Sequence, residues 1–351
     1  MSTANRSARG PEGISVGSRT VHGQERPNPP VDPPSRLTRV ANRATRWGLR
    51  RHLRGYVAIS PKEIQIGGTA PKWILRNEQD HSDLIIAKLG AKNGRIEVLT
   101  ELFNNLLGDR LGFGMAQCGI ARLDEHIYFL SRSFLQPGEL LIQGSLMIED
   151  VCAAEGETAR VPHREEQSFY SLDFLHEVFR KFCGPSAEAV FSNFVDMLFF
   201  DALIGSTDRH AQNWGLVTTR ERGLFRFAPI FDSAHALLWD LHSDKLRSIA
   251  NEAGIQRYTR KAFPCVGPPV VPGRTGRRWN HFALIQEIVG FSPEAALTSM
   301  KKIGDAVPEV AAELLKEFPF ARGFEALRKR LILRVLQSRA LQVLASAQKR
   351  G

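Results

Sequence analysis

One segment restricts the fold more than any other, the almost wholly apolar stretch FSNFVDMLFFDALI at 191–204. Apolar residues occupy nearly every face of a helix drawn through it, so that helix must be buried on all sides. The chain has 351 residues, of which 43% are hydrophobic, and this is enough for the core that such a helix requires. Polar residues follow at once in GSTDRHAQNWGLV (205–217). A polar cluster between a buried helix and a short strand is either a well-satisfied turn or a functional site.

The order of patterns along the chain predicts an α+β fold of two lobes. Short β-rich runs separated by polar or glycine turns fill residues 56–135, interrupted by one helix over 95–112. After QPGELL at 136–141 the pattern is predominantly helical to residue 351, except for the passage 205–233. We therefore predict a small β-rich N-lobe over 56–135 and a larger, mainly helical C-lobe over 136–351, with a ligand site in the cleft between them.

The basic charge of the chain is concentrated at its N-terminus. Residues 1–55 contain eleven arginines and three acidic residues, which accounts for eight of the ten net positive charges. Residues 1–35 are rich in Gly, Pro, Ser and Arg and are predicted to be a disordered basic arm. Residues 36–55 fit a basic amphipathic helix that packs on the body or docks an acidic partner. Because the rest of the chain is nearly neutral, we expect no direct binding of nucleic acid by the body.

The cysteines and the hydropathy pattern indicate a cytoplasmic protein. Cys118, Cys152, Cys183 and Cys265 are far apart and have no metal-binding spacing, which is typical of buried thiols in a reducing compartment. No apolar run is long enough to cross a bilayer, and the first residues have no apolar segment typical of a secretory signal.

The polar loop contains the groups needed to transfer phosphate to a hydroxyl. Such a reaction requires a carboxylate that accepts the hydroxyl proton and hard oxygen ligands that hold Mg²⁺ against the phosphates of ATP. Asp208 is predicted to be the catalytic base, and Asn213 and Asp232 are predicted to bind Mg²⁺. His210 is predicted to support the loop through a hydrogen bond rather than to exchange protons.

The N-lobe contains the complementary groups for ATP. The turn IGGTAPK (66–72) could bring backbone N–H groups to phosphate, and we assign Gly67, Gly68, Thr69 and Lys72 to cofactor binding. Lys88 ends a buried strand and needs an acidic partner, for which Glu101 on the following helix is the natural candidate. Each residue alone has a structural explanation, but together they follow the order in which kinases place these parts.

Four stretches resemble the HipA-like serine/threonine kinases, the toxin components of bacterial toxin–antitoxin pairs. They are GGTAPK, IIAKLG with ELFNNLLGDRLG, GSTDRHAQNWGLV and LFRFAPIFDSAHAL, within residues 60–330. The resemblance implies a protein-kinase-like fold, use of ATP, a protein hydroxyl as acceptor and a separate antitoxin or subdomain as partner. It also implies Asp208 as base, Asn213 and Asp232 as Mg²⁺ ligands, and Lys88 with Glu101 at the ATP phosphates.

The sequence departs from the family pattern at two places. Thr69 and Ala70 stand where the family loop commonly has Ala-Gln after its glycine, so a glutamine contact is lost. Since members of the family autophosphorylate near this loop, Thr69 is a candidate for autophosphorylation. Larger members have an additional N-terminal subdomain, whereas this sequence has only the arginine-rich arm, so it is expected to be a short form.

The sequence therefore predicts an ATP- and Mg²⁺-dependent serine/threonine protein kinase of HipA-like type, with a cytoplasmic protein as substrate. Two alternatives remain open at this point. Lipid kinases share the Asp-Arg-His-x-x-Asn pattern, and small-molecule phosphotransferases share the two-lobed plan. An inactive kinase fold that serves only as a binding module is the alternative of a different class.

Overall fold

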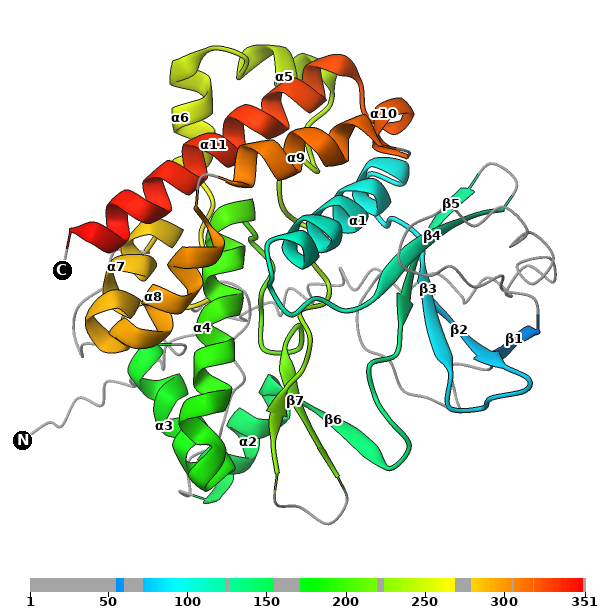
Figure 1. The fold of residues 1–351 in the computed structure, drawn as a ribbon, viewed down its shortest axis with the longest axis vertical. Helices are drawn as coiled ribbons and strands as arrows, with labels where there is room; N and C mark the ends of the chain where they lie inside the picture. The colour runs from blue at the N-terminus through cyan, green and yellow to red at the C-terminus, as the bar shows by residue number, and fades with distance from the viewer. Residues whose placement is uncertain are drawn as a thin grey trace, which may run out of the picture. The chain divides into compact units, whose positions relative to one another are not determined.

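Five antiparallel strands form the sheet of the N-terminal part (Figure 1). The strands are β1 (Tyr56–Ile59), β2 (Lys72–Asn77), β3 (Leu84–Lys88), β4 (Cys118–Leu123) and β5 (His126–Arg132), in the spatial order β1-β2-β3-β5-β4. Alternate residues of β2, β3 and β5 bury one face of the sheet in a small cluster, including Trp73, Leu75 and Tyr128. The central strand β3 ends at Lys88, which lies between Lys72 of β2 and Phe129 of β5.

The predicted helix over 95–112 is found as α1 (Arg95–Arg110), which packs on β4 and β5. Its far side packs on α9 (Ala306–Lys316) and α10 (Phe320–Gly323), so α1 is enclosed between the sheet and the C-terminal helices (Figure 1). Phe103 of α1 meets Phe320 edge to face at 5.4 Å between ring centroids. Both faces of α1 are therefore fixed by packing.

The apolar segment at 191–204 belongs to α4 (Ala187–Ile204), the central helix of the helical part. Every residue from Met197 to Ile204 is buried. Its neighbours are α3 (Leu172–Cys183), α7 (His281–Phe291), α8 (Pro293–Lys302) and α11 (Ala326–Gln348). The remaining helical elements are α2 (Gly144–Ala154), the 3₁₀ turn η3 (Gly184–Ser186), α5 (Ser243–Ser248) and α6 (Glu252–Arg260). As predicted from its apolar faces, α4 forms the centre of the core.

A second, three-stranded sheet flanks the polar loop, in the order β6-β7-β8. Its strands are β6 (Glu139–Gln143), β7 (Gly215–Thr219) and β8 (Arg226–Phe227). The chain is predominantly helical after 136–141, as predicted, but the strand at Glu139–Gln143 was not predicted; it pairs with β7, and helix starts at Gly144. The residues of β6 are partly exposed on both faces of the strand. The segment therefore lacks the alternation of apolar and polar residues by which a half-buried strand is identified from sequence.

The computed structural model describes residues 55–59, 72–123, 126–154, 171–219, 224–268, 279–304, 306–317 and 319–349. The chain divides into two units, 1–31 and 32–351, and all described residues belong to the second. The predicted arm and basic helix at 1–54 lie outside the described residues, as do Gly67, Gly68 and Thr69. Among the helices in the described ranges, none is long and apolar enough to span a membrane.

Candidate active site

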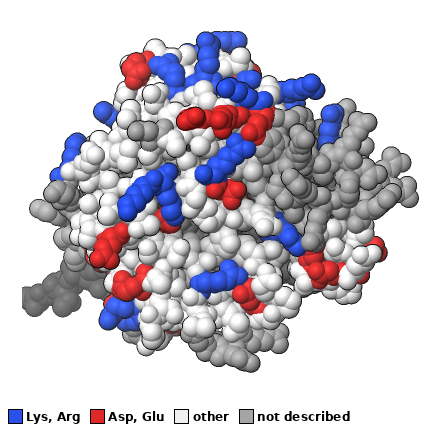
Figure 2. All heavy atoms as spheres, in the orientation of Figure 1, with Lys and Arg blue, Asp and Glu red and all other residues white. Residues whose placement is uncertain are grey.

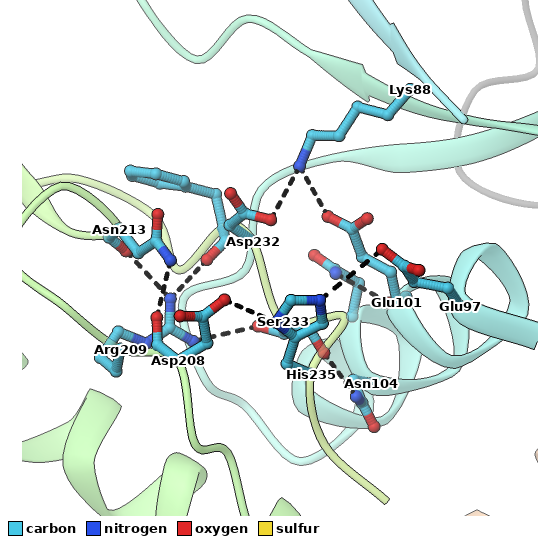
Figure 3. A network of polar contacts seen from close by, with 12 residues as sticks. Lys88, Glu97, Glu101, Asn104, Asp208, Arg209, Asn213, Asp232, Ser233 and His235 are labelled. Carbon is cyan, nitrogen blue, oxygen red and sulfur yellow. Dashed lines mark hydrogen bonds and ion pairs between the residues drawn. The ribbon is translucent and has the colours of Figure 1, made fainter. Parts of the chain in front are cut away.

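The polar loop starts where α4 ends. Gly205 has a φ of 71°, a left-handed conformation that favours glycine and that ends the helix. Asp208 follows three residues later, with 15% of its side chain exposed. The side-chain amide of Asn213 donates a 2.7 Å hydrogen bond to the backbone carbonyl of Asp208 (Figure 3). This bond closes the loop through the amide nitrogen of Asn213. It does not use the amide oxygen, which is the atom of Asn213 that could bind a metal ion.

Arg209 holds this loop against the segment that contains Asp232. Its guanidinium forms a buried two-pronged ion pair with Asp201 of α4, at 2.9 and 3.0 Å. It also donates to the backbone carbonyls of Asn213 and Phe231 and to the hydroxyl of Ser233. Burial lowers the pKa of Arg209, but the nearby acidic groups, Asp201 foremost and Asp232 next, raise it by more, so the guanidinium stays charged. The role of Arg209 was not predicted from the sequence, because its partners come from three separate segments.

Asp232 lies in a short segment that is fixed from two sides. Its own φ of 56° is left-handed, which is uncommon for a residue other than glycine. The next residue, Ser233, accepts a 2.7 Å hydrogen bond at its backbone carbonyl from the side chain of Asn104 in α1. Because Arg209 holds the same segment from the other side, the strained backbone at Asp232 is stabilised by its surroundings.

Lys88 connects the sheet, α1 and this segment. Its ammonium group lies 2.9 Å from Glu101 of α1 and 3.2 Å from Asp232 (Figure 3). Burial lowers the pKa of Lys88, but Asp232 and Glu101 together raise it above its usual value. Burial likewise raises the pKa of Asp232, whereas Lys88 and Lys72 lower it by more. All of these contacts favour a charged lysine beside an ionised carboxylate.

A second lysine faces the same place. Lys72 pairs in register with Lys88 across β2 and β3. Burial lowers the pKa of Lys72, and the positive charge of Lys88 lowers it further, whereas Asp232 and Glu101 raise it. Two neighbouring lysines repel each other, and an anion such as a phosphate would relieve that repulsion.

His235 is another residue of the site that was not predicted from the sequence. Its Nδ1 lies 2.6 Å from Oδ2 of Asp208, and its Nε2 lies 3.7 Å from Oε1 of Glu97 in α1. By contrast His210, the histidine assigned to loop support, lies 3.7 Å from Oδ1 of Asp208. The position of His235 three residues after Asp232 was the only sequence signal available. It could not be interpreted without knowing that this segment turns back toward Asp208.

The oxygen donors at the site fit Mg²⁺ better than they fit a metal ion that is coordinated by protein side chains only. The described part of the chain contains no group of three or more His, Cys, Asp and Glu residues that could enclose a metal ion. Asn213 and Asp232 offer one amide and one carboxylate, which is the kind of set that Mg²⁺ completes with substrate phosphates and water. Lys88 lies 3.2 Å from Asp232, and Lys72 lies opposite Lys88 in the sheet, so positive charge adjoins one of the two oxygen donors.

The structure thus brings together Lys72, Lys88, Glu101, Asp208, His210, Asn213 and Asp232 from both parts of the fold. This is a protein-kinase-like α+β fold, as predicted. In sequence the chain matches the HipA-like C-terminal domain over residues 64–311, and it belongs to that family. No curated protein matches the sequence significantly.

One solved structure supports this fold, and two others align with lower scores. The Helicobacter pylori proinflammatory kinase CtkA aligns with a TM-score of 0.67 at 14% identity, covering 84% of this chain and 98% of that one. The HipA–HipB–operator DNA complex of Shewanella oneidensis MR-1 aligns with a TM-score of 0.46 at 11% identity, covering 84% and 71%. The Golgi casein kinase aligns with a TM-score of 0.41 at 12% identity, covering 82% and 73%. At these identities the comparison concerns the fold, and the fold assignment depends on the first of the three.

Proposed function

We propose that this protein is an ATP- and Mg²⁺-dependent serine/threonine protein kinase of HipA-like type. The observation that carries the proposal is the position of Lys88, which contacts Glu101 and Asp232 at once. Kinases use a lysine held by a helix glutamate to bind the α- and β-phosphates of ATP. Here the same lysine also reaches the proposed metal ligand, on the segment that Arg209 fastens to the loop of Asp208.

Each residue has a definite part in the proposed reaction. Lys72 and Lys88 bind the phosphates of ATP, and Glu101 orients Lys88. Asn213 and Asp232 would hold Mg²⁺, which neutralises charge on the transferred phosphate. Asp208 accepts the proton of the acceptor hydroxyl as its oxygen attacks the γ-phosphorus, and the bond from that phosphorus to the bridging oxygen breaks, so that ADP leaves. Positioning and charge neutralisation supply most of the catalysis in such reactions.

The test is the transfer of labelled phosphate from ATP in a cell lysate with mixed anionic liposomes. Asp208-dependent label on serine or threonine in the protein fraction supports the proposal. Label only in the lipid fraction would instead favour a lipid kinase, which shares the Asp-Arg-His-x-x-Asn pattern. On the face seen in Figure 2 acidic and basic side chains are interspersed, without the broad basic face that an anionic membrane would attract. ATP binding without any transfer would favour an inactive binding module.

Asp232→Asn is expected to weaken ATP binding in the presence of Mg²⁺ by roughly tenfold or more, because one charged oxygen donor is lost. Without Mg²⁺ the same variant should lose much less affinity. Isothermal titration with and without Mg²⁺ measures both. The matched control is Asp240→Asn, which removes an exposed carboxylate outside the site. Equal ATP affinity of Asp232→Asn and wild type in Mg²⁺ would contradict the assignment of Asp232.

The family resemblance supports three further parts of the proposal. They are a toxin role against a cytoplasmic protein, a separate antitoxin partner, and autophosphorylation of Thr69 in the glycine turn. A phosphate on Thr69 would add about two negative charges beside the ATP phosphates, so it should inhibit the enzyme. Mass spectrometry after incubation with MgATP tests this part, and the absence of any modification in residues 60–72 would exclude it.

A further inference from the structure

One side chain bridges the proposed base and the helix that holds Lys88. His235 lies between Asp208 in the loop after α4 and Glu97 in α1 (Figure 3). The two carboxylates come from parts of the chain more than a hundred residues apart. Nδ1 is within hydrogen-bond distance of Asp208, whereas Nε2 makes a longer, 3.7 Å ion-pair contact with Glu97. Both ring nitrogens of His235 therefore face carboxylate oxygens, and only the protonated ring carries an N–H on each nitrogen and the positive charge that both carboxylates attract.

The surroundings of His235 fix the direction of its ring. The indole of Trp239 stacks on the imidazole, with 4.0 Å between ring centroids and 19° between planes. Glu97 is itself held by the backbone N–H groups of Lys92 and Asn93, at 3.0 and 3.2 Å. Since Trp239 holds the ring plane and Glu97 is anchored in turn, Nδ1 points at Asp208 and Nε2 points at Glu97.

The charged groups around His235 favour its protonated form. Asp208 and Glu97 face it from the loop and from α1, His210 lies on the far oxygen of Asp208, and Lys92 lies beyond Trp239, 5.9 Å from its ring. Burial lowers the pKa of His235, but the contacts with Asp208 and Glu97 raise it by more, to about 9. The pKa of Glu97 is correspondingly lowered to about 2, against the effect of its burial.

Glu97 and Glu101 lie one turn apart on α1, so they share a face of the helix. Glu101 holds Lys88, and Glu97 contacts His235. We propose that His235 is a positioning residue, an inference that rests on the proposed function. It couples the orientation of the base Asp208 to the placement of α1 and Lys88. A shift of α1 that withdrew Lys88 from ATP would then also release the base.

The fold itself does not depend on this bridge. Asn104 of α1 already binds the carbonyl of Ser233, two residues before His235, and Arg209 fastens the same segment to α4. Loss of His235 should therefore leave the chain folded and α1 attached. The contacts of its ring with Glu97 and Asp208 lie in the site and not in the core.

The kinetic test compares His235→Asn with wild type. We expect kcat to fall by roughly tenfold to a hundredfold, because misplacement of a reacting group by about 1 Å costs this much. The KM for ATP should change by less than about threefold, since Lys88 and Glu101 remain. In wild type, kcat should decline as the pH rises past about 9, where His235 loses its proton, and the variant should lack this decline.

The control is His176→Asn. Like His235, His176 contacts a carboxylate (Glu188, at 3.0 Å) and aromatic rings, but it lies on α3, outside the site. This variant should keep the wild-type kcat and pH profile. If His235→Asn also keeps both, the positioning role is wrong. A loss of ATP affinity as large as the loss of kcat would likewise overturn it, because that result would mean general damage to the site.

A second measurement does not need an active enzyme, so it separates this proposal from the proposed function. NMR titration of the imidazole, assigned by its absence in His235→Asn, should give a pKa well above the ordinary value of 6.5. Asp208→Asn and Glu97→Gln should each lower it. A His235 that titrates at its ordinary value and does not respond to Asp208→Asn would refute the bridge, whether or not the protein transfers phosphate.

Discussion

Asp208→Asn is expected to lower kcat for phosphate transfer by about 10²–10⁴-fold, because an amide cannot accept the proton of the acceptor hydroxyl. ATP affinity should stay within about threefold of wild type, since the proposed phosphate and metal contacts come from other side chains. The loop should also keep its shape. Asn213 donates to the backbone carbonyl of Asp208, which the substitution leaves in place.

The measurement is single-turnover transfer of labelled phosphate together with ATP binding by titration. Asp240→Asn again serves as the control, since it changes the same functional group at an exposed position. If Asp208→Asn retains more than about a tenth of the wild-type kcat, Asp208 is not the general base. If it instead loses ATP binding, its carboxylate belongs to the nucleotide or metal site.

The parts of the site that the sequence predicted are those in which short spacing fixes geometry. Asp208 and Asn213 lie on one tight loop, so a side chain five residues away can bond to the backbone of the first. Lys88 and Glu101 were paired correctly, because a buried lysine needs an acid and the next helix offers Glu101. Both predictions needed only local structure and the cost of a buried, unpaired charge.

The parts that the sequence did not reveal depend on contacts between distant segments. Arg209 joins α4, its own loop and the segment of Asp232, while Asn104 joins that segment to α1. His235 reaches Asp208 only because residues 233–239 turn back over the loop. Strand β6 was missed for a similar reason, since its partner β7 lies more than seventy residues further along the chain. No local pattern encodes such pairings.

Arg209→Met is expected to lower the free energy of unfolding by about 3–5 kcal/mol, because it leaves the Asp201 carboxylate buried without its positively charged partner. Both side chains of this pair are almost fully buried, at 3% and 2% exposed. The substitution also removes the donors to the carbonyls of Asn213 and Phe231. The loop of Asp208 and the segment of Asp232 would then be less firmly joined, so kcat should fall as well.

Urea unfolding of three variants tests whether the buried ion pair is responsible. Arg226→Met breaks an exposed ion pair with Glu139 (2.7 Å), so it should cost no more than about 1 kcal/mol. Adding Asp201→Leu to Arg209→Met removes the stranded charge and should restore part of the lost stability, because apolar replacement of a whole buried pair is often nearly neutral. The restored stability should come without restored kcat, since the hydrogen bonds between the two segments stay absent. If Arg209→Met costs no more than Arg226→Met, or if the double variant is less stable than Arg209→Met alone, Asp201 does not depend on Arg209 for compensation.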